Sequence, residues 1–147
     1  MTFLKLEPAN AYFHNHLAWL LATYPDAKLR DPQQAVKLAS KAVQLAPKEG
    51  GYWNTLGVAH YRADDWKAAV AALNKSVERK GGDASAWLFL AMAHHKLGNH
   101  DEGRKRYDQA VEWMNKNKAA LEKDRTKAEE LRRFHREAEE VLQLKKK

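Results

Sequence analysis

The sequence predicts an all-α protein, a right-handed array of three helical hairpins followed by a C-terminal capping helix. Three observations support this fold class. A pattern of aromatic and small residues recurs every 34 residues, each copy holds two helical stretches, and capping residues mark helix starts. The chain has 147 residues, of which 44% are hydrophobic. This is enough for one short repeat array with its own core.

The 34-residue period is clearest between the second and third copies. In the first helical stretch, Trp53, Leu56, Gly57 and His60 correspond to Trp87, Leu90, Ala91 and His94. In the second stretch, Ala69, Leu73 and Ser76 correspond to Gly103, Tyr107 and Ala110. An earlier copy holds the equivalent set His14, Leu17, Ala18, Leu21, Ala35, Ala39, Ala42 and Pro47. That copy carries five extra residues in its inter-helix loop, TYPDAKLRDP.

These residues resemble the signature of the tetratricopeptide repeat (TPR) family over residues 11–117. That signature reads Trp-x2-Leu-Gly-x2-Tyr, then Ala-x3-Phe, then Pro, on a 34-residue unit. The first copy departs from it with His14 at the Trp position, and the usual Tyr is replaced by Leu21, His60 and His94. The resemblance implies an α-solenoid of three TPR hairpins.

The expected organisation follows the repeats and the composition. The opening MTFLKLEPAN looks like the final turn of a preceding repeat, so we expect a fragment of a larger protein, with a short N-terminal extension as the alternative. The expected segments are residues 1–10, TPR 1 over 11–49, TPR 2 over 50–83, TPR 3 over 84–117 and a charged capping helix over 118–147.

Capping residues and glycines set the expected helix boundaries. Asp31 before Pro32 is typical of a helix start, Asn99 with Glu102 forms a capping box, and Asp83 opens another helix. Glycines at 50–51, 81–82 and 98 are expected in turns. Helices are therefore expected near residues 10–23, 32–46, 52–63, 65–79, 84–97 and 100–116.

Small residues are expected where the two helices of each hairpin cross, because they let helix axes approach closely. The expected pairs are Ala18 with Ala35, Gly57 with Ala69, and Ala91 with Gly103. Two tryptophans, Trp53 and Trp87, are expected to be buried between successive hairpins.

The C-terminal segment carries an apolar stripe at helical spacing, formed by Leu121, Ala128, Leu131, Phe134, Ala138 and Val141 or Leu142. Its expected role is to cover the exposed face of the last hairpin, as solenoids require. A coiled-coil partner helix is the alternative, and the charges between the apolar positions are expected to form a solvated face.

Composition and motifs argue against catalysis. The chain has no cysteine, and it lacks a Gly-rich phosphate loop, His-Glu-x-x-His and Gly-x-Ser-x-Gly. The seven histidines do not converge as metal ligands do, so we expect no enzyme, no cofactor and no metal. The net charge of +7 is spread evenly, so nucleic acid is not an expected partner. No stretch is long and apolar enough to span a membrane; a complete chain would be expected to be soluble and cytoplasmic, although the sequence leaves the compartment open.

The resemblance implies that the first helices of the hairpins line a concave groove that binds peptides or segments of partner proteins. The Asn15 and Asn54 amides would meet a peptide backbone, while Arg62 and Lys96 would favour acidic residues. The expected groove residues are Tyr12, Asn15, Trp19, Asn54, Val58, Tyr61, Arg62, Leu88, Met92, His95 and Lys96.

The leading hypothesis is therefore a protein–protein interaction scaffold. The alternative is a structural spacer or oligomerisation segment of a larger protein, and an enzyme or nucleic-acid binder comes third. The apolar side of the helix from Tyr12 to Leu21 also offers a surface for self-association through the N-terminal edge.

Overall fold

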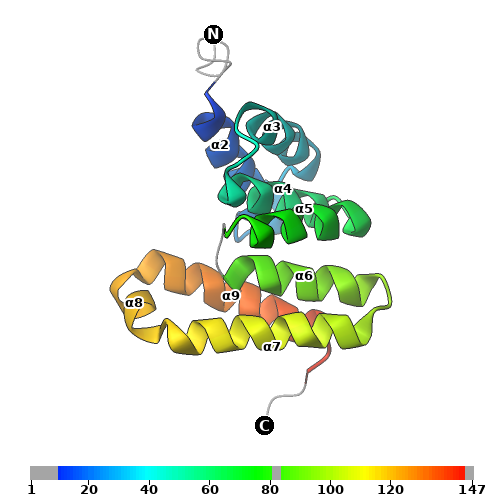
Figure 1. The fold of residues 1–147 in the computed structure, drawn as a ribbon, viewed down its shortest axis with the longest axis vertical. Coiled ribbons are helices and arrows are strands. Elements are labelled where there is room, and N and C mark those ends of the chain that lie inside the picture. The colour runs from blue at the N-terminus through cyan, green and yellow to red at the C-terminus, as the bar shows by residue number, and fades with distance from the viewer. Residues whose placement is uncertain (1–9, 81–83, 145–147) are drawn as a thin grey trace. The chain divides into compact units, whose positions relative to one another are not determined.

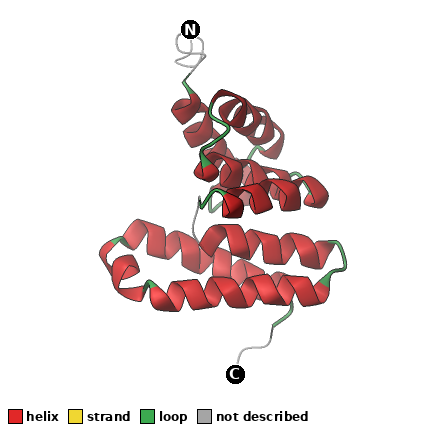
Figure 2. Ribbon diagram, in the orientation of Figure 1, coloured by secondary structure: helices red, strands yellow, loops and turns green. Residues whose placement is uncertain are grey.

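The computed structural model describes residues 10–80 and 84–144, and all regular secondary structure in these two ranges is helical (Figure 2). The predicted all-α helical-repeat architecture is confirmed. The chain divides into two compact units, Met1–Gly82 and Asp83–Lys147.

The first unit contains two helical hairpins. Helices α2 (Ala11–Thr23) and α3 (Pro32–Leu45) form the first, and α4 (Gly50–Arg62) and α5 (Trp66–Glu78) form the second. Contacts of α3 with α4 and of α2 with α4 join the hairpins (Figure 1). The two first helices, α2 and α4, therefore contact each other directly, as stacked hairpins require.

Side-chain caps explain where α3 and α5 begin. Asp31 Oδ1 accepts a hydrogen bond from the Gln34 amide at 3.2 Å, as predicted, and Asp65 Oδ1 caps α5 through Ala68 N at 3.2 Å. The turn expected at Gly50 and Gly51 is wrong, because both glycines belong to the first turn of α4.

The long loop of the first hairpin is ordered by its own hydrogen bonds. It contains a 3-10 helix, η1 (Ala27–Leu29), capped by Asp26. Arg30 Nε donates to the Tyr24 carbonyl at 2.7 Å, and the Asp31 amide donates to the Leu21 carbonyl at 2.9 Å. The extra residues are thus accommodated without separating the ends of α2 and α3.

The hairpin helices approach closely at small residues. A Cβ added at Gly57 would lie 2.6 Å from Leu73 Cδ2, and one added at Gly103 would lie 2.9 Å from the Ala91 carbonyl oxygen. Ala18 and Ala35 are completely buried. The predicted close crossing of Ala91 and Gly103 is confirmed, while the nearest neighbour across from Gly57 is Leu73 rather than Ala69.

The second unit begins with a hairpin of α6 (Ala84–Lys96) and α7 (His100–Lys116). A short helix α8 (Lys118–Lys123) follows, and α9 (Arg125–Val141) returns to pack against α6 (Figure 1). The rings of Phe89 and Phe134 meet edge to face, 4.9 Å between centroids. The segment expected to be a single capping helix is therefore two helices, separated at Asp124, which caps α9.

The expected burial of the two tryptophans is wrong, because Trp53 and Trp87 are both only half-buried. Trp53 Nε1 donates to the Pro47 carbonyl at 2.7 Å, and Lys75 Nζ lies 5.1 Å from the Trp53 ring centroid. These polar contacts suit a ring with one edge in solvent.

The capping box expected at the start of α7 is also wrong. The Asn99 side chain makes no capping hydrogen bond, and Glu102 accepts from Arg106 Nε at 2.9 Å instead. The expectations for residues 1–9, for the glycines at 81–82 and for Asp83 lie outside the described residues. Within the described ranges, no helix combines the length and apolar character that a membrane crossing needs.

Candidate functional site

The predicted groove residues divide between the two units. Seven lie on α2 and α4 of the first unit, and four lie on α6 of the second.

On α2, the predicted groove residues provide aromatic surface. Tyr12 is 58% exposed, and its ring stacks on that of His16 with 5.9 Å between centroids. Asn15 and Trp19 are half-buried. An exposed tyrosine held by a stacked neighbour offers contact area at a low cost in side-chain entropy.

On α4, the predicted groove residues are far less accessible. Asn54 and Tyr61 are each 6% exposed, and Val58 is completely buried. The side-chain oxygens of Asn15 and Asn54 are both buried from solvent. The α4 side of the first unit therefore supplies packing more than open polar surface.

Arg62 has a structural partner. Its Nε donates to the Ala22 carbonyl at 3.0 Å, near the C-terminus of α2. The last carbonyls of a helix have no hydrogen-bond donor within the helix, so a cation that donates to one of them satisfies it and complements the helix dipole. Arg62 thus ties α4 to α2, a role that its spacing in the sequence did not indicate.

On α6 the predicted groove residues differ in how far they are exposed to solvent. Leu88 and Met92 are completely buried, His95 is half-buried and Lys96 is exposed. The Nδ1 atoms of His95 and His100 lie 2.9 Å apart. Burial, and then the neighbouring His100, lower the pKa of His95. At this distance one Nδ1 donates a hydrogen bond and the other accepts it, so the two rings differ in which nitrogen carries the hydrogen.

His60 and His94 occupy equivalent positions in their repeats. Burial lowers the pKa of His60 and of His94, opposed in part by Asp65 and Glu102 respectively. No cluster of three or more His, Asp or Glu within residues 10–80 and 84–144 is arranged to hold a metal ion.

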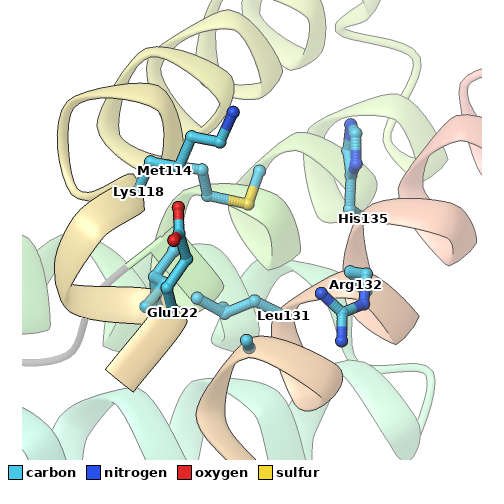
Figure 3. Close-up of a pocket in the computed structure, with 8 residues that line it drawn as sticks. Met114, Lys118, Glu122, Leu131, Arg132 and His135 are labelled. Atoms are coloured by element: carbon cyan, nitrogen blue, oxygen red, sulfur yellow. The ribbon is translucent and has the colours of Figure 1, made fainter. Parts of the chain in front are cut away.

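One concave site contains none of the predicted groove residues. A pocket of about 250 Å³ lies among α7, α8 and α9 in the second unit (Figure 3). Apart from Met114 on α7, its lining comes from the charged C-terminal segment, which the sequence indicated only as a cover. The available signal was Asp124, a capping residue type inside a helical run. The lining residues are Met114, Lys118, Leu121, Glu122, Ala128, Leu131, Arg132 and His135.

Helical hairpins that repeat every 34 residues and cross at glycine or alanine define a helical-repeat protein of the tetratricopeptide type. A family model described as anaphase-promoting complex, cyclosome, subunit 3 matches residues 29–110, more than half of the chain. The chain belongs to this family, whose repeats are TPR-like.

Solved structures agree on the fold. Two crystal structures of MamA each give a TM-score of 0.64 at 23% sequence identity and cover 94% of this chain. The match spans 81% of one MamA chain and 76% of the other. Curated protein sequences gave no match. At this identity the likeness shows a shared helical-repeat fold.

Proposed function

We propose that the chain is a scaffold that binds a peptide or a segment of a partner protein on the surface of its first helices. The direct contact between α2 and α4 carries this proposal, because it places the first helices of two hairpins side by side. Stacked first helices form the inner wall of a helical-repeat array, where such proteins bind extended segments.

The proposed site in the first unit centres on α2. The exposed Tyr12 ring and the half-buried Trp19 supply aromatic contact area, and Asn15 lies one turn from each. Asn54, Val58 and Tyr61 support this wall from α4. The proposed second part is on α6, where Leu88 and Met92 support the half-buried His95 and the exposed Lys96.

Acidic residues in the ligand are proposed on chemical grounds. Lys96 is an exposed cation, and Arg62 adds positive charge near the C-terminus of α2. Both would attract carboxylates. The family description names a subunit of a multiprotein complex, which supports a protein partner for this chain. We expect no catalytic activity and no dedicated nucleic-acid binding.

The test uses peptides selected on the protein itself. Random dodecapeptides displayed on phage are enriched on the wild-type chain, and the affinity of the enriched peptides is then measured for Tyr12→Ala and Lys96→Glu. Leu29→Ala is the matched control, because Leu29 is 59% exposed and lies on η1, outside the proposed first-helix residues.

We expect roughly tenfold weaker binding by Tyr12→Ala, since aromatic anchors at interfaces contribute about 1–2 kcal/mol or more. Leu29→Ala should bind as the wild type does. Failure to enrich any peptide, or an equal loss of affinity in Tyr12→Ala and Leu29→Ala, would favour the alternative role as a spacer or oligomerisation segment.

A further inference from the structure

The pocket in the second unit has an apolar floor and a charged rim. Met114 and Leu131 lie between Lys118 and Glu122 on one side and Arg132 and His135 on the other (Figure 3). All of these residues belong to α7, α8 or α9, so the pocket is separate from the proposed first-helix surface.

The hollow arises because the chain turns twice within a short distance. Asn117 ends α7 by donating its side-chain amide to the Trp113 carbonyl at 2.8 Å, and α8 then has only six residues before Asp124 caps α9. So short a helix contributes few apolar side chains. Leu121 on α8 remains half-buried, whereas Leu131 on α9 is 1% exposed.

The polar rim carries more positive than negative charge. Lys118 and Arg132 are exposed cations, and the pocket holds one carboxylate, Glu122. None of the ion pairs found among the described residues involves Lys118 or Arg132. Their charged ends remain available for a ligand, while their aliphatic stems can extend the apolar wall.

His135 is held in place differently. Its Nε2 lies 2.8 Å from the Tyr107 hydroxyl, and the two rings stack with 5.5 Å between centroids. This contact fixes one side of the pocket to α7. The site is thus formed before a ligand arrives, which lowers the entropic cost of binding.

The size of the pocket points to side chains rather than to a free small molecule. Its volume of about 250 Å³ lies below the range of about 300–1,000 Å³ that is typical of small-molecule sites. An apolar hollow of this size on a helical surface suits the anchor residues of a protein segment.

We infer that this pocket docks a segment of a partner protein, which inserts one or two apolar side chains between Met114 and Leu131 and presents carboxylates to Lys118 and Arg132. Charge complementarity selects the partner: acidic residues next to the apolar anchor are attracted, and basic ones are repelled by the rim. Glu122 sets the orientation, because it disfavours a carboxylate on its own side.

The experiment uses fluorescent dodecapeptide pools and the full chain. One pool mixes Leu, Ile, Phe and Met with Asp and Glu, a second replaces the acidic residues by Lys and Arg, and a third replaces the apolar residues by Ser. Fluorescence anisotropy measures binding to the wild type, to Lys118→Glu/Arg132→Glu and to Arg136→Glu. Arg136 is the matched control because it is exposed on α9 but does not line the pocket.

The acidic apolar pool should bind most tightly to the wild type. The double variant should weaken it by about tenfold or more, as expected for two charge-assisted contacts, and Arg136→Glu by less than about twofold. Equal binding of the basic pool, equal binding of the Ser pool, or an equal loss in Arg136→Glu would overturn the inference. The last result would indicate attraction to the positive surface as a whole.

A second measurement does not depend on any variant. Methyl resonances of Met114 and Leu131 should shift on addition of the acidic apolar pool, whereas those of Leu38 and Leu73, buried in the first unit, should not. Binding without a shift at Met114 and Leu131 would place the ligand elsewhere. Because these residues lie outside the proposed first-helix surface, failure here leaves the Tyr12 experiment unaffected.

Discussion

The Tyr107 hydroxyl lies 2.8 Å from Nε2 of His135, and this hydrogen bond joins α7 to α9 across 28 residues of sequence. Burial raises the pKa of Tyr107, with a further contribution from Glu139. The hydroxyl is therefore neutral at physiological pH and can hydrogen-bond the imidazole as donor or acceptor. The C-terminal helix is thus held to the hairpin by a polar contact as well as by its apolar stripe.

Removing this hydroxyl should loosen the attachment of α9. Tyr107→Phe leaves His135 Nε2 without its partner, so we expect the free energy of unfolding to fall by about 0.5–1.5 kcal/mol. Urea denaturation measures the change. Tyr12→Phe provides the control, because Tyr12 is 58% exposed and should lose almost nothing. Equal effects of the two substitutions would mean that the bond to His135 contributes no stability.

Two of the three glycines of α4, Gly57 and Gly51, predict opposite outcomes when a side chain is added. At Gly57 an added side chain meets Leu73, so Gly57→Leu should overpack the crossing and cost on the order of 1–3 kcal/mol or more. At Gly51 nothing lies within 4 Å of an added Cβ, so Gly51→Ala should stabilise the chain by about 0.4–1 kcal/mol. Thermal melts followed by circular dichroism compare them. An unchanged melting temperature for Gly57→Leu would contradict the close packing of α4 on α5.

Stability should decrease as the pH falls below the ordinary histidine pKa of 6.5. Burial lowers the pKa of His60 and His94 in the folded chain, so the unfolded chain binds protons more readily over this window. The stability that depends on neutral His60 and His94 is fully present above pH 6.5. It declines as the pH falls, until the pH lies below the pKa values of both histidines in the folded chain. Urea midpoints at pH 7.5 and pH 5.5 measure the decline.

Histidine variants assign that dependence to its source. His60→Gln and His94→Gln should each reduce the difference between the two pH values, whereas His16→Gln, at an exposed position, should leave it unchanged. A pH dependence that survives unchanged in the double variant would have to come from other groups, such as His95, whose pKa is also lowered.

Self-association through α2 is a further prediction. Leu17 is 37% exposed and Leu20 is 36% exposed on this helix, near the exposed Tyr12. Adjacent exposed apolar side chains favour contact with a second copy. Sedimentation velocity at increasing concentration should show a dimer that Leu17→Ser/Leu20→Ser removes. Leu45→Ser is the control, since Leu45 has the same exposure of 37% but lies at the end of α3. A monomer at millimolar concentration would exclude this contact.

The helix boundaries and hairpin crossings were predictable because local signals determine them. Asp31 marks its helix by its own capping bond, and the 34-residue period places Ala91 opposite Gly103 without any knowledge of tertiary structure. The same reasoning failed for Asn99, where Glu102 pairs with Arg106 instead of completing the capping box. A capping pattern in the sequence does not determine whether the carboxylate bonds the backbone at the helix start or a basic side chain one turn later.

The candidate site was less predictable than the fold, since exposure depends on contacts between elements. Tyr12 and Asn54 occupy groove positions in the repeat pattern, yet one is 58% exposed and the other 6%. The bond from Arg62 to the Ala22 carbonyl spans 40 residues and has no sequence signature. The sequence does not indicate the C-terminal pocket, because Asp124 stands among many charged residues although it separates two helices.

The return of α9 to α6 has a consequence for synthesis of the chain. Phe89 is covered by Phe134, which leaves the ribosome 45 residues later. At a synthesis rate of about 5–20 residues per second, the aromatic face of α6 therefore stays uncovered for about 2–9 seconds before Phe134 has been synthesised. Each hairpin of the first unit, in contrast, can close as soon as its second helix appears. Of the two units, the nascent second unit therefore has the greater need of protection from aggregation, which early binding of a chaperone could provide.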